Sequence, residues 1–138
     1  MTPRLAQREI ALAGVALLAA VVALAFALGR TSHDETLPQP VGAWETVLAG
    51  VRTREDYGKT TACGTVLRPG TNGVSHAVLP CGAKIFVAYD GKTVLTQVID
   101  RGPYVPGRAL DLTAPLAARL GLRGVQPVRW AYAGQPVH

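Results

Sequence analysis

Two carboxylates stand where a protein scaffold could use them for acid–base chemistry. Asp100 follows the apolar stretch that ends at Ile99, and Asp111 lies between Leu110 and Leu112. Each precedes an irregular loop or the start of a helix, where functional side chains are usually displayed. Burial beside apolar surface raises the pKa of a carboxyl group, so either could hold a proton to donate to a glycosidic oxygen.

Both carboxylates also have ordinary structural interpretations. Asp100 could cap a turn by accepting backbone N–H bonds, or pair with Arg101 or Arg108. Asp111 could be a residue at the start of a helix, stabilised there by the helix dipole. Spacing alone does not decide between these structural roles and a catalytic one.

The remaining polar residues narrow the classes of enzyme. His76 stands in a predicted loop and is a candidate acid or base because imidazole titrates near neutral pH; otherwise it is simply solvated. His33 and His138 are assigned no role. The serines, Ser32 and Ser75, lie outside nucleophile-elbow patterns, and the sequence has no glycine-rich phosphate loop. These observations disfavour a serine hydrolase or a nucleotide-dependent enzyme.

The chain contains two cysteines, Cys63 and Cys81. In an oxidising compartment such a pair usually forms one disulfide, and the alternatives are two free thiols or a metal site. The histidines lack zinc-ligand spacing to the cysteines. We therefore predict a disulfide, and neither a metal site nor a cofactor.

The N-terminal segment, residues 1–30, predicts export. The run Ile10–Leu28 is apolar and uncharged, and as a helix it would cover about 28 Å, close to the thickness of a bilayer core. Arg4 and Arg8 precede it, which favours an N-terminus in the cytoplasm and the domain outside, with the protein in the cell membrane. The alternative is a cleaved signal peptide ending near Ala25–Ala27, which would leave the domain secreted.

The charge pattern bears on possible partners. The whole chain has a net charge of +5, part of which lies in the N-terminal segment; from residue 31 onward, 11 Lys and Arg against 8 Asp and Glu leave +3, and this excess is scattered. No basic run is interleaved with aromatic residues, so nucleic-acid binding is disfavoured. A mild positive charge is compatible with an anionic cell-wall polymer.

Local patterns after the apolar run predict a linker followed by one small domain. Residues 31–42 are polar and contain two prolines, as linkers do, and the domain is expected over residues 43–138. Within it, Lys84–Tyr89 and Lys92–Ile99 are rich in β-branched and aromatic residues. The Asp90-Gly91 pair between them predicts a tight hairpin.

The other elements are short. Residues 43–54 fit either a helix or a strand. Thr113 is expected to cap a short helix with its hydroxyl, and Gly121 to end it. Further short strands are predicted at Thr61–Leu67, Ala109–Leu112 and Gln126–Tyr132. Six strands and one helix favour an all-β closed barrel, which leaves no exposed sheet edge.

Four segments, in this order, resemble the rare lipoprotein A (RlpA-like) domain. The resemblance implies a six-stranded double-psi β-barrel with one short helix, a fold shared with expansins and barwin-like proteins. The paired cysteines fit the disulfide-bearing versions of that domain. The segments are Gly58–Gly64 (GKTTACG), Ser75–Gly82 (SHAVLPCG), Val98–Tyr104 (VIDRGPY) and Gly107–Thr113 (GRALDLT).

The resemblance also implies an activity. Enzymes of the family are lytic transglycosylases that act on peptidoglycan glycan strands without a cofactor. An acid protonates the leaving oxygen, and the sugar's own 6-hydroxyl closes an anhydro ring. By motif match, Asp100 is the expected acid and base, His76 a supporting group, and Asp111 the carboxylate on which related expansins depend. The same match implies substrate-binding roles for Arg101, Tyr104 and Arg108.

The sequence departs from the family pattern at specific places. Active members carry a Glu and an Asp where this chain has Thr65 and Arg68, and an aromatic Trp-Tyr-Gly where it has residues 51–53. Three functions therefore stay open: a cell-envelope lytic transglycosylase, a non-catalytic expansin-like module that binds peptidoglycan, and an envelope scaffold protein. The first is preferred. Expected partners are glycan strands and the membrane.

Overall fold

The computed structural model of the protein describes residues 13–24 and 37–134. They belong to two compact units, Met1–Glu35 and Thr36–His138. The described part of the first unit is helical. Within the described residues, no helix is both long and apolar enough to cross a membrane. The predicted anchor over Ile10–Leu28 lies partly outside these residues.

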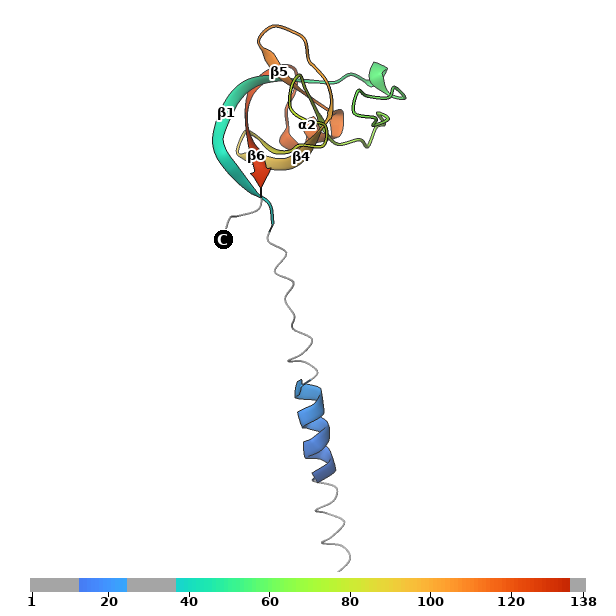
Figure 1. Cartoon of the computed structure of the whole chain (residues 1–138), viewed down its shortest axis with the longest axis vertical. Helices are drawn as coiled ribbons and strands as arrows, with labels where there is room; N and C mark the ends of the chain where they lie inside the picture. The colour runs from blue at the N-terminus through green and yellow to red at the C-terminus, as the bar shows by residue number, and fades with distance from the viewer. Residues whose placement is uncertain (1–12, 25–36, 135–138) are drawn as a thin grey trace, which may run out of the picture. The chain divides into compact units, whose positions relative to one another are not determined.

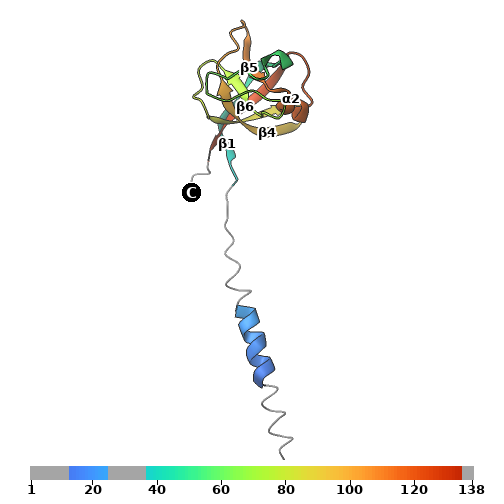
Figure 2. The same ribbon diagram turned by 90° about the vertical axis from the view of Figure 1, so that its right-hand side faces the viewer.

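The second unit is a closed β-barrel with strand order β1-β5-β2-β4-β3-β6 (Figures 1 and 2). The pairs β1/β5 and β2/β4 are parallel, and the other pairs are antiparallel. The expected six-stranded barrel with one short helix is confirmed. Its elements are β1 Gln39–Val51, the 3₁₀ turn η1 Arg54–Asp56, β2 Val74–His76, β3 Lys84–Tyr89, β4 Lys92–Asp100, β5 Arg108–Leu112, α2 Ala114–Leu120 and β6 Gln126–Gly134.

The predicted hairpin is present as β3 and β4. Tyr89 pairs with Lys92 across the two-residue turn. Asp90 and Gly91 both have positive φ angles, 47° and 72°. A tight hairpin turn of this kind needs positive φ at both positions, which explains why the Asp-Gly pair was informative.

Three local predictions were wrong or incomplete. Residues 43–54 contribute to a strand, and that strand begins at Gln39, inside the predicted linker. Thr61–Leu67 is not a strand, since its only bridge in the described structure pairs Thr60 with Val66 inside a tight turn. His76, expected in a loop, is the last residue of β2.

The start of α2 also differs in detail from the prediction. Thr113 is the N-cap residue, but its hydroxyl makes no capping bond to the helix. It instead accepts a hydrogen bond from the Gly73 N–H at 3.2 Å, while the Thr113 N–H donates to the Gly73 carbonyl at 3.0 Å. The helix start is therefore tied to the residue before β2. Gly121 ends the helix with φ 75°, as expected.

The hydrophobic core fills the barrel and extends beneath α2. Strands β1 to β6 each contribute buried aliphatic side chains or Trp130, and α2 contributes two leucines. Burial of each large aliphatic side chain is worth about 1.5–3 kcal/mol, which makes this core the main source of stability. The largest fully buried side chains are Ile85, Leu110, Leu112, Leu116, Leu120, Val74, Val87, Val98 and Val128.

A disulfide joins Cys63 and Cys81, as predicted. It crosslinks the turn at residues 61–65 to the loop that follows β2. Both segments lack regular sheet pairing, so the crosslink supplies a constraint that the strand ladder does not.

Replacing both cysteines by serine should lower the free energy of unfolding by about 3 kcal/mol, because the 18-residue separation gives a sizeable loop-closure entropy. Urea denaturation of the oxidised protein and of the Cys63→Ser/Cys81→Ser variant measures this difference. Reduction of the wild type should reproduce it. Equal stability of all three samples would show that the loops are held without the crosslink.

Candidate functional site

Strand pairing places both predicted carboxylates in one row across the barrel wall. Ser75 on β2 pairs with Asp111 on β5 to one side and with Asp100 on β4 to the other. Neighbouring strands are about 4.8 Å apart, so the two aspartates are separated by roughly 10 Å along this row. We call Asp111, Ser75 and Asp100 the acidic row.

A β-bulge aims Asp100 to the same side as Ser75. Val74 pairs with Val98, whereas the next residue, Ser75, pairs with Asp100, so Ile99 is the extra residue of β4. Val74 and Val98 face the core. Without the extra residue, strict alternation would put Asp100 on the core side as well, so the bulge redirects it outward.

A second bulge does the same for Arg108. Leu48 pairs with Arg108 and the next residue, Ala49, with Leu110, which makes Ala109 the extra residue of β5. Arg108 therefore lies on the outer side of the barrel with Asp111, whereas Leu110 and Leu112 face the core. Its Nη2 donates to Asp111 Oδ2 at 3.2 Å.

Arg52 lies over the acidic row. It follows β1 directly, and its N–H donates to the Leu112 carbonyl at 2.8 Å. Its Nη1 donates to Ser75 Oγ at 2.8 Å and to Asp100 Oδ2. Its Nε lies 3.4 Å from Asp56 Oδ2. One guanidinium thus joins β2, β4 and the 3₁₀ turn η1.

Asp100 is held as a carboxylate. Besides Arg52, its Oδ1 accepts the N–H groups of Ala62 at 2.9 Å and Arg101 at 2.8 Å. Burial raises the pKa of this carboxyl, but the hydrogen bonds and the charge of Arg52 outweigh burial, and the net pKa lies below its ordinary value. The sequence-based expectation of a raised pKa is therefore wrong for Asp100.

The same expectation is right for Asp111. Burial raises its pKa more than Arg108 and Arg52 lower it. Arg108 Nε lies 3.0 Å from Asp111 Oδ1, close enough for an ion pair, but the two atoms are not aligned for a hydrogen bond. Asp111 also packs tightly on Gly50, where an added Cβ would lie 2.8 Å from Oδ1.

His76 does not join the acidic row. It pairs with the core residue Leu110, so it lies on the opposite side of β2 from Ser75. Its Nδ1 accepts the N–H groups of Val78 at 3.1 Å and Leu79 at 3.0 Å. Burial, followed by the charge of Arg101, lowers the pKa of His76, which keeps the ring neutral at neutral pH.

The predicted substrate-binding residues have different environments. Arg101 is half-buried, and its Nη1 donates to the Leu79 carbonyl at 2.6 Å. Arg108 is occupied by Asp111. Tyr104 is 79% exposed in the loop between β4 and β5 and is free to contact a ligand. A role in substrate binding remains a prediction for all three.

The turn that carries Thr65 borders Asp100. The Thr61 N–H donates to the Thr65 carbonyl at 2.8 Å, and the Thr65 N–H donates to Thr61 Oγ1 at 3.0 Å. This closed turn presents the Ala62 N–H to Asp100, and the disulfide at Cys63 secures it. Arg68 lies exposed beyond the turn.

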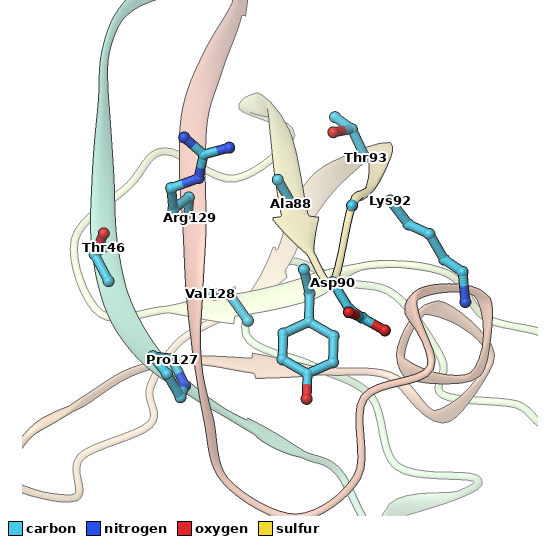
Figure 3. A pocket seen from close by; sticks show the side chains of 10 residues that line it. Thr46, Ala88, Asp90, Lys92, Thr93, Pro127, Val128 and Arg129 are labelled. Carbon is cyan, nitrogen blue, oxygen red and sulfur yellow. The ribbon is translucent and has the colours of Figure 1, made fainter.

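Hollows of different composition lie beside β1. The first, of about 520 Å³, is lined by β1, β5 and β6, includes Arg108, and so adjoins the acidic row. The second, of about 380 Å³, is lined by the β3–β4 turn together with residues of β1 and β6 (Figure 3). Its Lys92 extends towards α2, with Nζ 3.3 Å from the position a Cβ would take at Gly121.

The sequence did not predict the ion pair of Arg52 with Asp100 or the hydrogen bond of Arg52 to Ser75. Arg52 lies 48 residues before its partner Asp100. No local pattern signals such a pair. Within residues 13–24 and 37–134, no group of three or more His, Cys, Asp or Glu side chains could hold a metal ion.

A family model described as lytic transglycolase matches residues 53–130, more than half of the chain. The chain belongs to this family. The matched segment includes all three residues of the acidic row and both cysteines of the disulfide. The expected relationship to RlpA-like double-psi β-barrels is confirmed.

Curated relatives of this lytic transglycolase family member are named endolytic peptidoglycan transglycosylase RlpA. The Yersinia pestis protein is 36% identical over 77 residues, which are 54% of this chain and 21% of the relative. The Pasteurella multocida protein is 32% identical over 98 residues, 70% of this chain and 33% of the relative. The chain therefore spans about a fifth to a third of the length of these relatives.

Solved structures share the fold at low sequence identity. The Streptomyces papain inhibitor has a TM-score of 0.53 at 24% identity, covering 69% of this chain and 98% of the inhibitor. The Clavibacter michiganensis expansin has a TM-score of 0.55 at 21% identity, covering 70% of this chain and 53% of the expansin.

The lowered pKa of Asp100 predicts a pH-dependent contribution to stability. A depressed folded-state pKa stabilises the protein above the unfolded-state pKa, and this contribution is lost as pH falls through the folded-state value. Asp100→Asn should lower the free energy of unfolding at pH 7 by about 2–3 kcal/mol, because it removes the negative charge and replaces one of the two buried acceptor oxygens by an NH2 donor. The difference from wild type should shrink below about pH 4.

Urea denaturation from pH 7 to about pH 3 measures this trend. Asp111 is present in both proteins, so its opposite pH dependence cancels from the difference. Asp90→Asn is the matched control, because Asp90 is exposed in a turn and asparagine tolerates positive φ. A constant difference across pH would contradict the assignment of Asp100 as a stabilising carboxylate.

Proposed function

We propose that this barrel cleaves peptidoglycan glycan strands as a lytic transglycosylase outside the cytoplasm. The observation that carries the proposal is the acidic row: two carboxylates at family-matched positions lie on one outer face and have opposite pKa shifts. Environments that push two carboxyl pKa values apart are typical of acid–base pairs. The names of the curated RlpA relatives supply the substrate class.

The proposed reaction itself needs no cofactor. Cleavage without added water needs a proton for the leaving glycosidic oxygen and an acceptor for the proton of the attacking 6-hydroxyl. Asp100 and Asp111 are the carboxylates available on the acidic row. The hollow beside Arg108 adjoins the row and gives a glycan chain room to continue along β1.

A second candidate is a non-catalytic module that binds peptidoglycan. It is favoured by Thr65, which by motif match stands where active family members carry a glutamate, in the turn that contacts Asp100. An expansin of the same fold was solved in complex with cellohexaose, which supports a glycan ligand for either candidate.

The test is product analysis. The full chain in detergent is incubated with amidase-treated, peptide-free peptidoglycan, and mass spectrometry is used to detect anhydro-sugar ends. Wild type should release them, and Asp100→Asn and Asp111→Asn should each reduce the rate by about 100-fold or more, because each removes a proton-transfer group. Asp90→Asn should behave as wild type.

Circular dichroism and free-thiol titration confirm that each variant is folded and oxidised, and rates are expressed per folded protein. Sedimentation of wild type with peptidoglycan, without anhydro products, would replace the transglycosylase with the binding module. If Asp100→Asn and Asp111→Asn both keep wild-type product formation and binding, the acidic row is excluded as the site.

We further propose that the N-terminal segment anchors the protein in the cytoplasmic membrane with the barrel outside. The apolar run and the preceding arginines support this arrangement, and a cleaved signal peptide is the alternative. Intact-mass measurement of the membrane fraction should find the uncleaved chain. A soluble product that begins just after Ala27 would establish secretion instead.

A further inference from the structure

We propose that Arg52 is a positioning residue that divides the acidic row into a base and an acid, holding Asp100 as the anion and leaving Asp111 to donate the proton. The catalytic part of this inference rests on the proposed transglycosylase function. The geometric part concerns the free protein and is testable without substrate.

Arg52 is itself fixed in place. Its backbone N–H is bonded to Leu112 at the end of β5, and its side chain is only 18% exposed. Ser75 Oγ accepts from the same Nη1 that binds Asp100, and Asp56 accepts from Nε. The guanidinium therefore cannot leave Asp100 without also breaking its contacts with Ser75 and Asp56.

The hydrogen bonds around Asp100 require the ionised form. Its two oxygens accept from Arg52, Ala62 N–H and Arg101 N–H, and each of these partners is a donor with no acceptor to offer. A proton on either oxygen would face a donor. Protonation of Asp100 would therefore cost at least one of these bonds, which is a geometric reason for its lowered pKa.

Asp111 has the opposite arrangement. Oδ2 accepts one long hydrogen bond from Arg108 Nη2 at 3.2 Å, and the buried Oδ1 lies 3.0 Å from Arg108 Nε without an aligned hydrogen bond. Protonation of Asp111 therefore costs at most this one hydrogen bond, whereas Asp100 accepts three. Burial of the carboxyl favours the neutral form, in agreement with the raised pKa.

In the proposed step one proton is donated and one is accepted. Asp111 gives its proton to the glycosidic oxygen as the C1–O4 bond breaks, and Asp100 accepts the proton of the 6-hydroxyl as the C1–O6 bond forms. The positive charge that develops on the sugar in the transition state is stabilised by the anionic Asp100. After each turnover the two carboxyls exchange the extra proton with solvent.

The charges around both carboxyls determine in which direction their pKa values should move when Arg52 is replaced. Asp100 faces Arg52, and Asp111 faces Arg108, Arg52 and the like charge of Asp56. Removing the charge of Arg52 should therefore raise the pKa of both, with the larger effect on Asp100, which is in direct contact.

Carboxyl-carbon NMR titration of the full-length protein tests the geometric part. In wild type, Asp100 should titrate below and Asp111 above the ordinary aspartate value. Arg52→Gln should raise the pKa of Asp100, Arg52→Lys should largely restore it, and Arg54→Gln, an exposed neighbour in η1, should leave it unchanged. An ordinary or raised pKa for Asp100 in wild type would overturn the inference, even if the variants failed to fold.

The pH dependence of kcat/KM tests the catalytic part. The acidic limb reports ionisation of the base and should move to higher pH in Arg52→Gln, but not in Arg52→Lys or Arg54→Gln. An acidic limb that stays in place while the NMR pKa moves would show that Asp100 is not the base. If wild type forms no anhydro product, the proposed function fails, and the NMR titration alone decides whether Arg52 holds Asp100 ionised.

Discussion

The carboxylate of Asp100 is the point on which the outer face of this barrel depends. A buried charge must be compensated by donors, or the cost of removing it from water is not recovered. Here the donors come from the end of β1, from the disulfide-bonded turn and from the residue after Asp100 itself. These segments are distant in sequence, so one charge fixes the relative positions of three parts of the chain.

Two extra residues make this arrangement possible. The core needs Val98 and Leu110 inside the barrel, and regular alternation from those positions would turn Asp100 inward and Arg108 away from Asp111. The bulges at Ile99 and Ala109 satisfy the core and the acidic row together. The close approach of Gly73 to Ile99, where a Cβ would lie 2.7 Å from its side chain, accommodates the first of them.

Local signals in the sequence were sufficient for much of the fold. The Asp90-Gly91 turn, the cysteine pair and the alternating strands each depend on neighbouring residues or on simple pairing, and the structure confirms them. The Arg52–Asp100 pair was beyond such reasoning because it depends on the parallel pairing of β1 with β5 and of β2 with β4. The hydroxyl of Thr113 was misassigned for the same reason, since its partner lies 40 residues away.

Residue type and burial do not determine in which direction the pKa of a carboxyl moves. Asp100 and Asp111 both follow apolar stretches and both are largely buried, yet their pKa values move in opposite directions because one meets three aligned donors and the other only one. Thr65 provides no carboxyl near Asp100, so under the proposed function the proton donor on the acidic row is Asp111, whose pKa is raised. Catalysis by this chain would then depend on a division of roles that Arg52 imposes.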